Sequence, residues 1–119
     1  MYKRQALWVA GFADAFPPRD GGGGAHPLSR AARREMQLPQ VAILSPRGGT
    51  FPDHSTASYG FGLFVEEDPA FGTIVQHSGG YPGYGSQMRW HPATGIGTVV
   101  LGNGTYAAAG QLAALAASV

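Results

Sequence analysis

The large apolar residues of this chain are concentrated in its second half, and this distribution limits where a folded core can form. Residues 17–58 hold few of them and include four consecutive glycines, whereas residues 59–106 are rich in aromatic and branched aliphatic side chains. The chain has 119 residues, of which 44% are hydrophobic and 13% are charged. A chain of this length buries about two thirds of the surface of its unfolded state. We therefore expect one small globular unit with its core in the second half.

Composition excludes several classes of protein and of site. A net charge of +1 removes the main driving force for binding nucleic acid. The chain has no Cys, so a disulfide scaffold and a Cys-based zinc site are impossible. The four histidines are far apart in sequence, and the longest uncharged stretches carry too much Gly and Ala for a membrane span. We expect no nucleic-acid partner, no metal, no cofactor and no membrane span in this segment, and the sequence does not specify a compartment.

The first five residues differ from the rest of the chain. They contain Lys3, the only lysine, whereas every other basic residue is an arginine. They read Met-Tyr-Lys-Arg-Gln and look like a translated sequencing adaptor, so we expect a non-native leader there; an ordinary basic N-terminus is the alternative. The expected organisation is a leader over residues 1–5, a helical and loop segment over 6–58, and an antiparallel sheet with a C-terminal helix over 59–119.

Two helices are predicted in the first half. Residues 7–16 place aromatic side chains at every fourth position, which is typical of an amphipathic helix. Ser29 is a typical N-cap and predicts a second helix that runs to about residue 37. Its arginines, Arg30, Arg33 and Arg34, are expected on a solvated face. The glycine-rich residues 20–27 are expected to form a linker, and residues 40–58 a long loop with a short strand at 41–44.

The second half predicts an antiparallel sheet, and the fold class is α+β with helices at both ends. Apolar residues alternate over 59–65, which predicts a strand, and a second strand is expected over 73–78 before a break at residues 79–83. Residues 86–91 and 96–101 predict a hairpin around a turn at 92–95. Thr105 is expected to cap a last helix with Leu112 and Leu115 in its apolar stripe. Its many alanines suggest close packing on the strand face that carries Gly60 and Gly62.

The segment around His77-Ser78-Gly79-Gly80 has the most chemical content. A strand that ends in a polar pair followed by two glycines presents side chains and uncovered backbone N–H groups together, and such an edge can bind an oxyanion. From these residues alone, an ordinary strand end remains the other interpretation.

Three segments, in this order, resemble the C-terminal part of the serine β-lactamase-related family. They are residues 59–65 (Tyr-Gly-Phe-Gly-Leu-Phe-Val), residues 77–84 (His-Ser-Gly-Gly-Tyr-Pro-Gly-Tyr) and residues 90–103, which begin Trp-His-Pro-Ala-Thr-Gly. The family includes class C β-lactamases, D-alanyl-D-alanine carboxypeptidases and many esterases. The resemblance implies a partial β-lactamase/transpeptidase-like domain and acyl-enzyme chemistry on a small ester, amide or peptide substrate.

The resemblance also assigns roles to single residues. His77, Ser78 and Gly79 match the family's third motif in its His-Ser/Thr-Gly form, and His in place of Lys favours esterase or peptidase activity over β-lactamase activity. Ser78 would hydrogen-bond the substrate, Gly80 would offer its N–H to the oxyanion, and neither glycine would block the substrate's approach. The expected site residues are His77, Ser78, Gly79 and Gly80 in the catalytic wall, with Tyr81 and Tyr84 contacting substrate.

The family's other two motifs are absent from this sequence. No serine stands three residues before Lys3, and Leu101 occupies the tyrosine position relative to Asn103, the only asparagine. The Ser-x-x-Lys nucleophile and the Tyr-x-Asn motif are therefore missing, and we expect a fragment that is inactive alone. The alternative is a noncatalytic module that binds a ligand or partner through its Tyr81 to Tyr84 loop.

Overall fold

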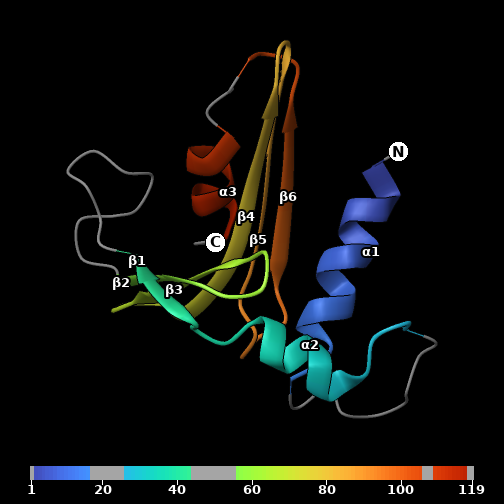
Figure 1. Ribbon diagram of the computed structural model, residues 1–119. Coiled ribbons are helices and arrows are strands. Elements are labelled where there is room, and N and C mark those ends of the chain that lie inside the picture. Colours follow the sequence, from blue (N-terminus) through green and yellow to red (C-terminus); the bar gives the residue numbers. More distant parts are fainter. Residues whose placement is uncertain (1, 17–25, 44–55, 106–108, 118–119) are drawn as a thin grey trace.

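The computed structural model describes residues 2–16, 26–43, 56–105 and 109–117. These residues form three helices and one six-stranded antiparallel sheet, in which the strands lie side by side in chain order (Figure 1). The helices are α1 (Tyr2–Ala13), α2 (Arg30–Met36) and α3 (Ala109–Ala117). The strands are β1 (Val41–Ile43), β2 (Thr56–Tyr59), β3 (Phe64–Asp68), β4 (Gly72–Tyr81), β5 (Tyr84–Trp90) and β6 (Gly97–Gly102). This is the predicted α+β class.

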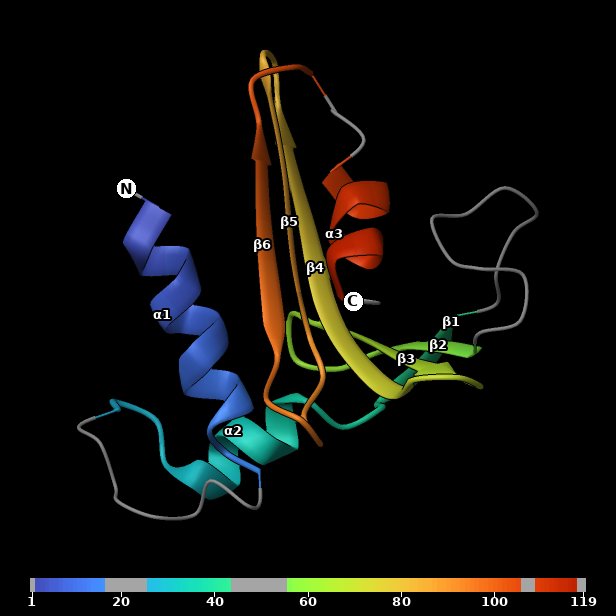
Figure 2. The same cartoon turned by 180° about the vertical axis from the view of Figure 1, so that it is seen from behind.

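The first and last helices cover opposite faces of the sheet. A Cβ added to Gly97 of β6 would lie 2.5 Å from Val9 of α1, whereas Thr98 donates its hydroxyl to the Ala113 carbonyl of α3. Because successive strand residues point to opposite faces, the sheet separates the two helices. The two views agree, with α1 and α3 on either side of the long β4–β6 strands (Figures 1 and 2).

The main core lies between α1 and the sheet, and its centre is a buried polar contact. Trp90 and Phe12 are fully buried with ring centroids 6.1 Å apart. The Trp90 indole N–H donates to the side-chain oxygen of Gln37 at 2.8 Å. The Gln37 amide in turn donates to the carbonyl oxygens of Phe12 and Arg33. One glutamine therefore connects both N-terminal helices to β5.

The helices of the first half differ from prediction in one important respect. The Ser29 cap is confirmed, since its hydroxyl accepts the Ala32 N–H at 3.1 Å. The predicted solvated arginine face is wrong at Arg33, which is buried and donates to the Gly11 carbonyl. Carbonyls in the last turn of a helix lack helical partners, so an arginine from α2 can satisfy one in α1. The first helix also begins at Tyr2, earlier than predicted.

The predicted strand over residues 59–65 is in fact the end of one strand and the start of the next. A Cβ on Gly60 would lie 2.6 Å from the Met36 carbonyl oxygen, and Gly62 has a φ of +75°. Both positions suit glycine, and both lie in the connection between the end of β2 and the start of β3. The expected break at residues 79–83 is also wrong, since β4 continues to Tyr81. The predicted hairpin around residues 92–95 is confirmed by the pairing of β5 with β6.

The last helix packs through its alanines. Ala109 and Ala113 are buried, whereas Leu112 and Leu115 are exposed, so the leucine stripe does not form the contact. The helix contacts β5 and β6, whereas Gly60 lies against the Met36 and Leu38 carbonyls. The Thr105 hydroxyl accepts the Gly83 N–H at 2.7 Å. The N–H groups that a Thr105 cap would bond belong to residues 106–108, which lie outside the described residues, so the cap stays a prediction.

Several predicted segments lie outside the described residues. They are most of the linker over 20–27, most of the loop over 40–58, and the last two residues of the chain. No helix among the described residues has the length and apolar character needed to cross a membrane.

Replacing Gln37 with Met tests the polar centre of the core. The free energy of unfolding should fall by about 2 kcal/mol, because the Trp90 N–H would stay buried without an acceptor. Urea unfolding followed by tryptophan fluorescence measures the change. The control is Gln40→Met at an exposed position, which should change stability by less than about 0.5 kcal/mol. Equal losses in the two variants would contradict this role.

Candidate active site

The predicted catalytic wall lies on a part of β4 that has only one neighbouring strand. Strand β3 pairs with β4 only as far as the Phe64–Gln76 pair, whereas β5 pairs with it up to the Tyr81–Tyr84 pair. Residues 77–81 therefore have a strand on one side alone within the described parts of the chain. We call residues 77–81 the edge segment.

The register directs part of this backbone away from β5. A two-residue turn, Pro82 and Gly83, joins the strands, which makes Tyr81 and Tyr84 a hydrogen-bonded pair. Hydrogen-bonded and non-hydrogen-bonded pairs alternate along antiparallel strands, so Ser78 and Gly80 belong to non-hydrogen-bonded pairs. Their N–H and C=O groups point to the open side of the edge segment. The Gly80 amide thus faces the open side, as binding an oxyanion requires.

His77 is the one half-buried side chain of the edge segment, and ring contacts hold it. Its Nε2 lies 3.3 Å from the Tyr59 hydroxyl, and its Nδ1 lies 2.5 Å from the Ser78 carbonyl oxygen. The Phe64 ring lies against it, with a centroid separation of 5.5 Å. Ser78, by contrast, is exposed. Three adjacent strands therefore contribute to the position of the imidazole.

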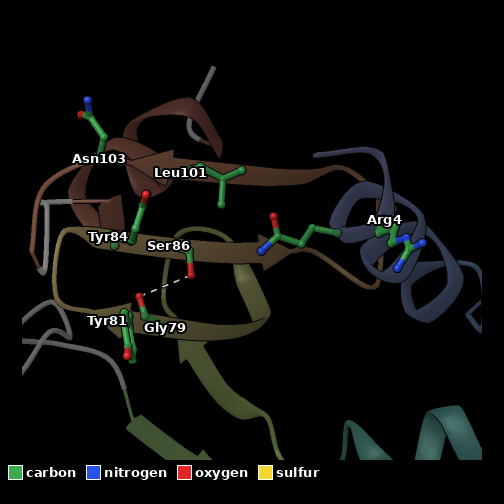
Figure 3. A pocket seen from close by; sticks show the side chains of 11 residues that line it. Arg4, Gly79, Tyr81, Tyr84, Ser86, Leu101 and Asn103 are labelled. Atoms are coloured by element: carbon green, nitrogen blue, oxygen red, sulfur yellow. Dashed lines mark hydrogen bonds between the residues drawn. The ribbon is translucent and has the colours of Figure 1, made fainter. Parts of the chain in front are cut away.

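The two tyrosines lie at the tip of the hairpin, where a broad depression of about 1370 Å³ opens. Tyr81 is 73% and Tyr84 64% exposed. The depression brings both tyrosines together with Gly79 and Gly80, and the Ser86 hydroxyl donates to the Gly79 carbonyl (Figure 3). His77 and Ser78 do not line it. Its α1 side is formed by Arg4 and Gln5, which belong to the predicted leader.

A buried polar cluster, which the sequence did not predict, lies next to the edge segment. One carboxylate oxygen of Glu66 accepts the Gln76 amide and the other accepts Arg89, both at 2.6 Å. Gln87 donates to the side-chain oxygen of Gln76, also at 2.6 Å. We call these four residues the support network. It joins β3, β4 and β5, and it includes the residue before His77 and the register partner of Ser78.

The support network and Tyr59 were missed for the same reason. Their partners are far apart in sequence and meet only through strand register. One signal was available in the sequence: polar residues stand at positions of β3 to β5 that face the interior. Buried polar groups need hydrogen-bond partners, so such residues indicate a paired cluster. Among the described residues, no group of three or more His, Asp or Glu side chains could hold a metal ion.

Comparison with known proteins shows which family the chain belongs to. A family model described as Beta-lactamase matches residues 8–119. The chain belongs to the β-lactamase family. One stretch of 33 residues is 52% identical to Penicillin-binding protein 4* of Bacillus subtilis (strain 168), which covers 28% of this chain and 7% of that relative. The matching stretch thus covers only a small part of the length of that relative. No solved structure matches the chain.

Replacing Glu66 with Gln tests the support network. The variant should lose about 3–5 kcal/mol of stability, because the Arg89 charge would remain buried without its counter-ion. Urea unfolding measures the loss. Glu67→Gln is the matched control, since Glu67 is exposed and its hydrogen bond with Thr73 lies at the surface. A loss no larger than that of the control would show that the network does not support the sheet.

Proposed function

We propose that this chain forms one wall of the active site of a serine hydrolase that acts on small esters, amides or peptides through an acyl-enzyme. The observation that carries the proposal is the open edge segment, where the sequence His77-Ser78-Gly79-Gly80 lies on a strand with one free side. Membership in the β-lactamase family supports it.

The edge segment suits the oxyanion side of an acyl transfer. When a serine attacks an ester or amide carbonyl, negative charge develops on the carbonyl oxygen, and a backbone N–H aimed at that oxygen stabilises it by about 3 kcal/mol. We assign this role to the Gly80 amide. The Ser78 hydroxyl is exposed beside it and would hydrogen-bond the substrate. An extended substrate could also pair with the outward N–H groups of Ser78 and Gly80 and with the Gly80 carbonyl, as an added strand does.

The two exposed tyrosines would contact the part of the substrate beyond the reacting carbonyl. Each combines a large apolar ring with a polar hydroxyl, which suits a surface that receives a ligand from water. The residue at position 77 favours esters or peptides over β-lactams. A lysine gives a fixed positive charge for a substrate carboxylate, whereas a histidine does not.

The chemistry itself would need residues that this sequence lacks. Neither Ser-x-x-Lys nor Tyr-x-Asn occurs in it. In serine hydrolases, removal of the nucleophile lowers turnover about a millionfold, which one oxyanion donor cannot compensate. We therefore propose that the chain is inactive alone and acts within a longer protein that supplies the nucleophile.

A fluorophosphonate probe, which labels activated serines, tests whether the nucleophile lies outside the 119-residue chain. The longer protein encoded by the gene should be labelled at the serine of an upstream Ser-x-x-Lys motif, and the 119-residue chain should not be labelled. Mass spectrometry of the labelled peptide locates the serine. Labelling of the 119-residue chain at a single serine would contradict the proposal. A gene without the two motifs would favour the noncatalytic module that binds through Tyr81 and Tyr84.

Replacing His77 with Ala tests its role in the longer protein. Ester turnover should fall about a hundredfold, as expected for loss of a group that assists proton transfer or binds the reacting group. The free energy of unfolding should change by less than about 1 kcal/mol, because the ring is only half buried. His26→Ala, remote from β4, is the control and should leave turnover unchanged. Parallel losses of folding and activity would give His77 a structural role.

A further inference from the structure

We propose that Tyr59 is a positioning residue for His77, and that its hydroxyl holds the imidazole in the tautomer that carries its proton on Nδ1. The effect on catalysis rests on the function proposed above, whereas the effect on the ring does not. The observation behind the proposal is the pair of contacts on the two ring nitrogens, one to the Tyr59 hydroxyl and one to the Ser78 carbonyl.

The chemistry of the two partners fixes where the proton lies. A carbonyl oxygen can only accept a hydrogen bond, so the Nδ1 that lies 2.5 Å from it must carry hydrogen. In a neutral imidazole, Nε2 then has a lone pair and needs a donor. The Tyr59 hydroxyl, 3.3 Å away, is the donor at that position. The same hydroxyl can accept a hydrogen bond when Nε2 is protonated, so it retains the ring in both charge states.

Tyr59 is itself held in place from two directions. Its ring packs edge-on against Phe64, with centroids 4.8 Å apart and an interplanar angle of 79°. The next residue, Gly60, passes so close to the Met36 carbonyl that a Cβ would lie 2.6 Å from its oxygen. The Phe61 amide donates to that same carbonyl at 3.2 Å. The end of α2 thus fixes the end of β2, and with it the hydroxyl that reaches His77.

This arrangement changes the role expected for His77. With both nitrogens engaged, the neutral ring has no free lone pair with which to remove a proton from substrate. Its role is then to hold the Ser78 carbonyl, and with it the edge segment, through a fixed ring. Tyr59 determines which nitrogen carries the hydrogen.

Imidazole nitrogen-15 spectra of the 119-residue chain at pH 8 test the proposal. In the wild type, the His77 Nδ1 should resonate as a protonated nitrogen and Nε2 as an unprotonated one. Tyr59→Phe keeps the ring and removes the hydroxyl, so the ratio of the Nδ1–H to the Nε2–H tautomer should fall about fivefold, as loss of one ordinary hydrogen bond predicts. Tyr84→Phe, at an exposed position, is the control and should leave the ratio unchanged.

Two results would overturn the proposal. One is a wild-type ring that carries its hydrogen mainly on Nε2, a result that needs no variant. The other is a Tyr59→Phe ratio equal to that of the wild type. Tyr59→Gln, which offers an amide N–H in place of the hydroxyl, should restore part of the Nδ1–H preference and separates loss of the donor from loss of packing.

Kinetics of the longer protein separate this proposal from the function on which it rests. Tyr59→Phe should lower kcat for an ester about tenfold and leave KM within about twofold, because the ring is misoriented while the substrate contacts remain. If His77→Ala slows turnover and Tyr59→Phe changes neither kcat nor the tautomer ratio, the positioning role fails and the hydrolase remains. If the tautomer ratio shifts in a protein without hydrolase activity, the proposed function fails and the positioning role remains.

Discussion

The hydrogen bond from the buried Trp90 indole to Gln37 is the interaction on which the rest of this structure depends. A buried indole N–H without an acceptor is costly, so the glutamine must stay at the end of α2. From there Gln37 also donates to the Phe12 carbonyl in the last turn of α1. Its neighbour Met36 supplies the carbonyl against which the chain turns after β2. A contact in the core therefore determines where Tyr59 lies, and through it the imidazole of His77.

The candidate site arises from a difference in length between two neighbouring strands. The pairing of β3 with β4 stops at Gln76, and β4 continues for five more residues. The support network lies next to that point. Its residues lie on the α3 face of the sheet, since Arg89 is the register partner of Thr98. Within the described parts of the chain, β4 thus has a strand on each side up to Gln76 and on one side beyond it. A rigid strand with a free side suits a surface that must present backbone groups without rearrangement.

The sequence predicted what is local and missed what depends on register. The strand over residues 73–78, the Ser29 cap and the turn at residues 92–95 follow from short-range preferences and were predicted correctly. Gly79 and Gly80 indicated a break because glycine weakens strands, yet pairing with β5 continues through both. Arg33 and the support network have partners on other elements, which no local pattern reveals. The candidate site residues were proposed from a motif, whereas the contact between Tyr59 and His77 required the strand order.

The unpaired side of β4 also bears on how the chain behaves in solution. Proteins commonly protect such sides with charged residues, proline or a covering loop. From residue 77 to residue 81 this strand carries no aspartate, glutamate, lysine or arginine, and the first proline comes only at position 82. Within the described parts of the chain, this is a template onto which a second molecule can add its own β4. Dimers in which two copies of β4 pair side by side are the expected form of self-association, and their population should increase with protein concentration. An extended substrate would compete with the second molecule for the same backbone groups.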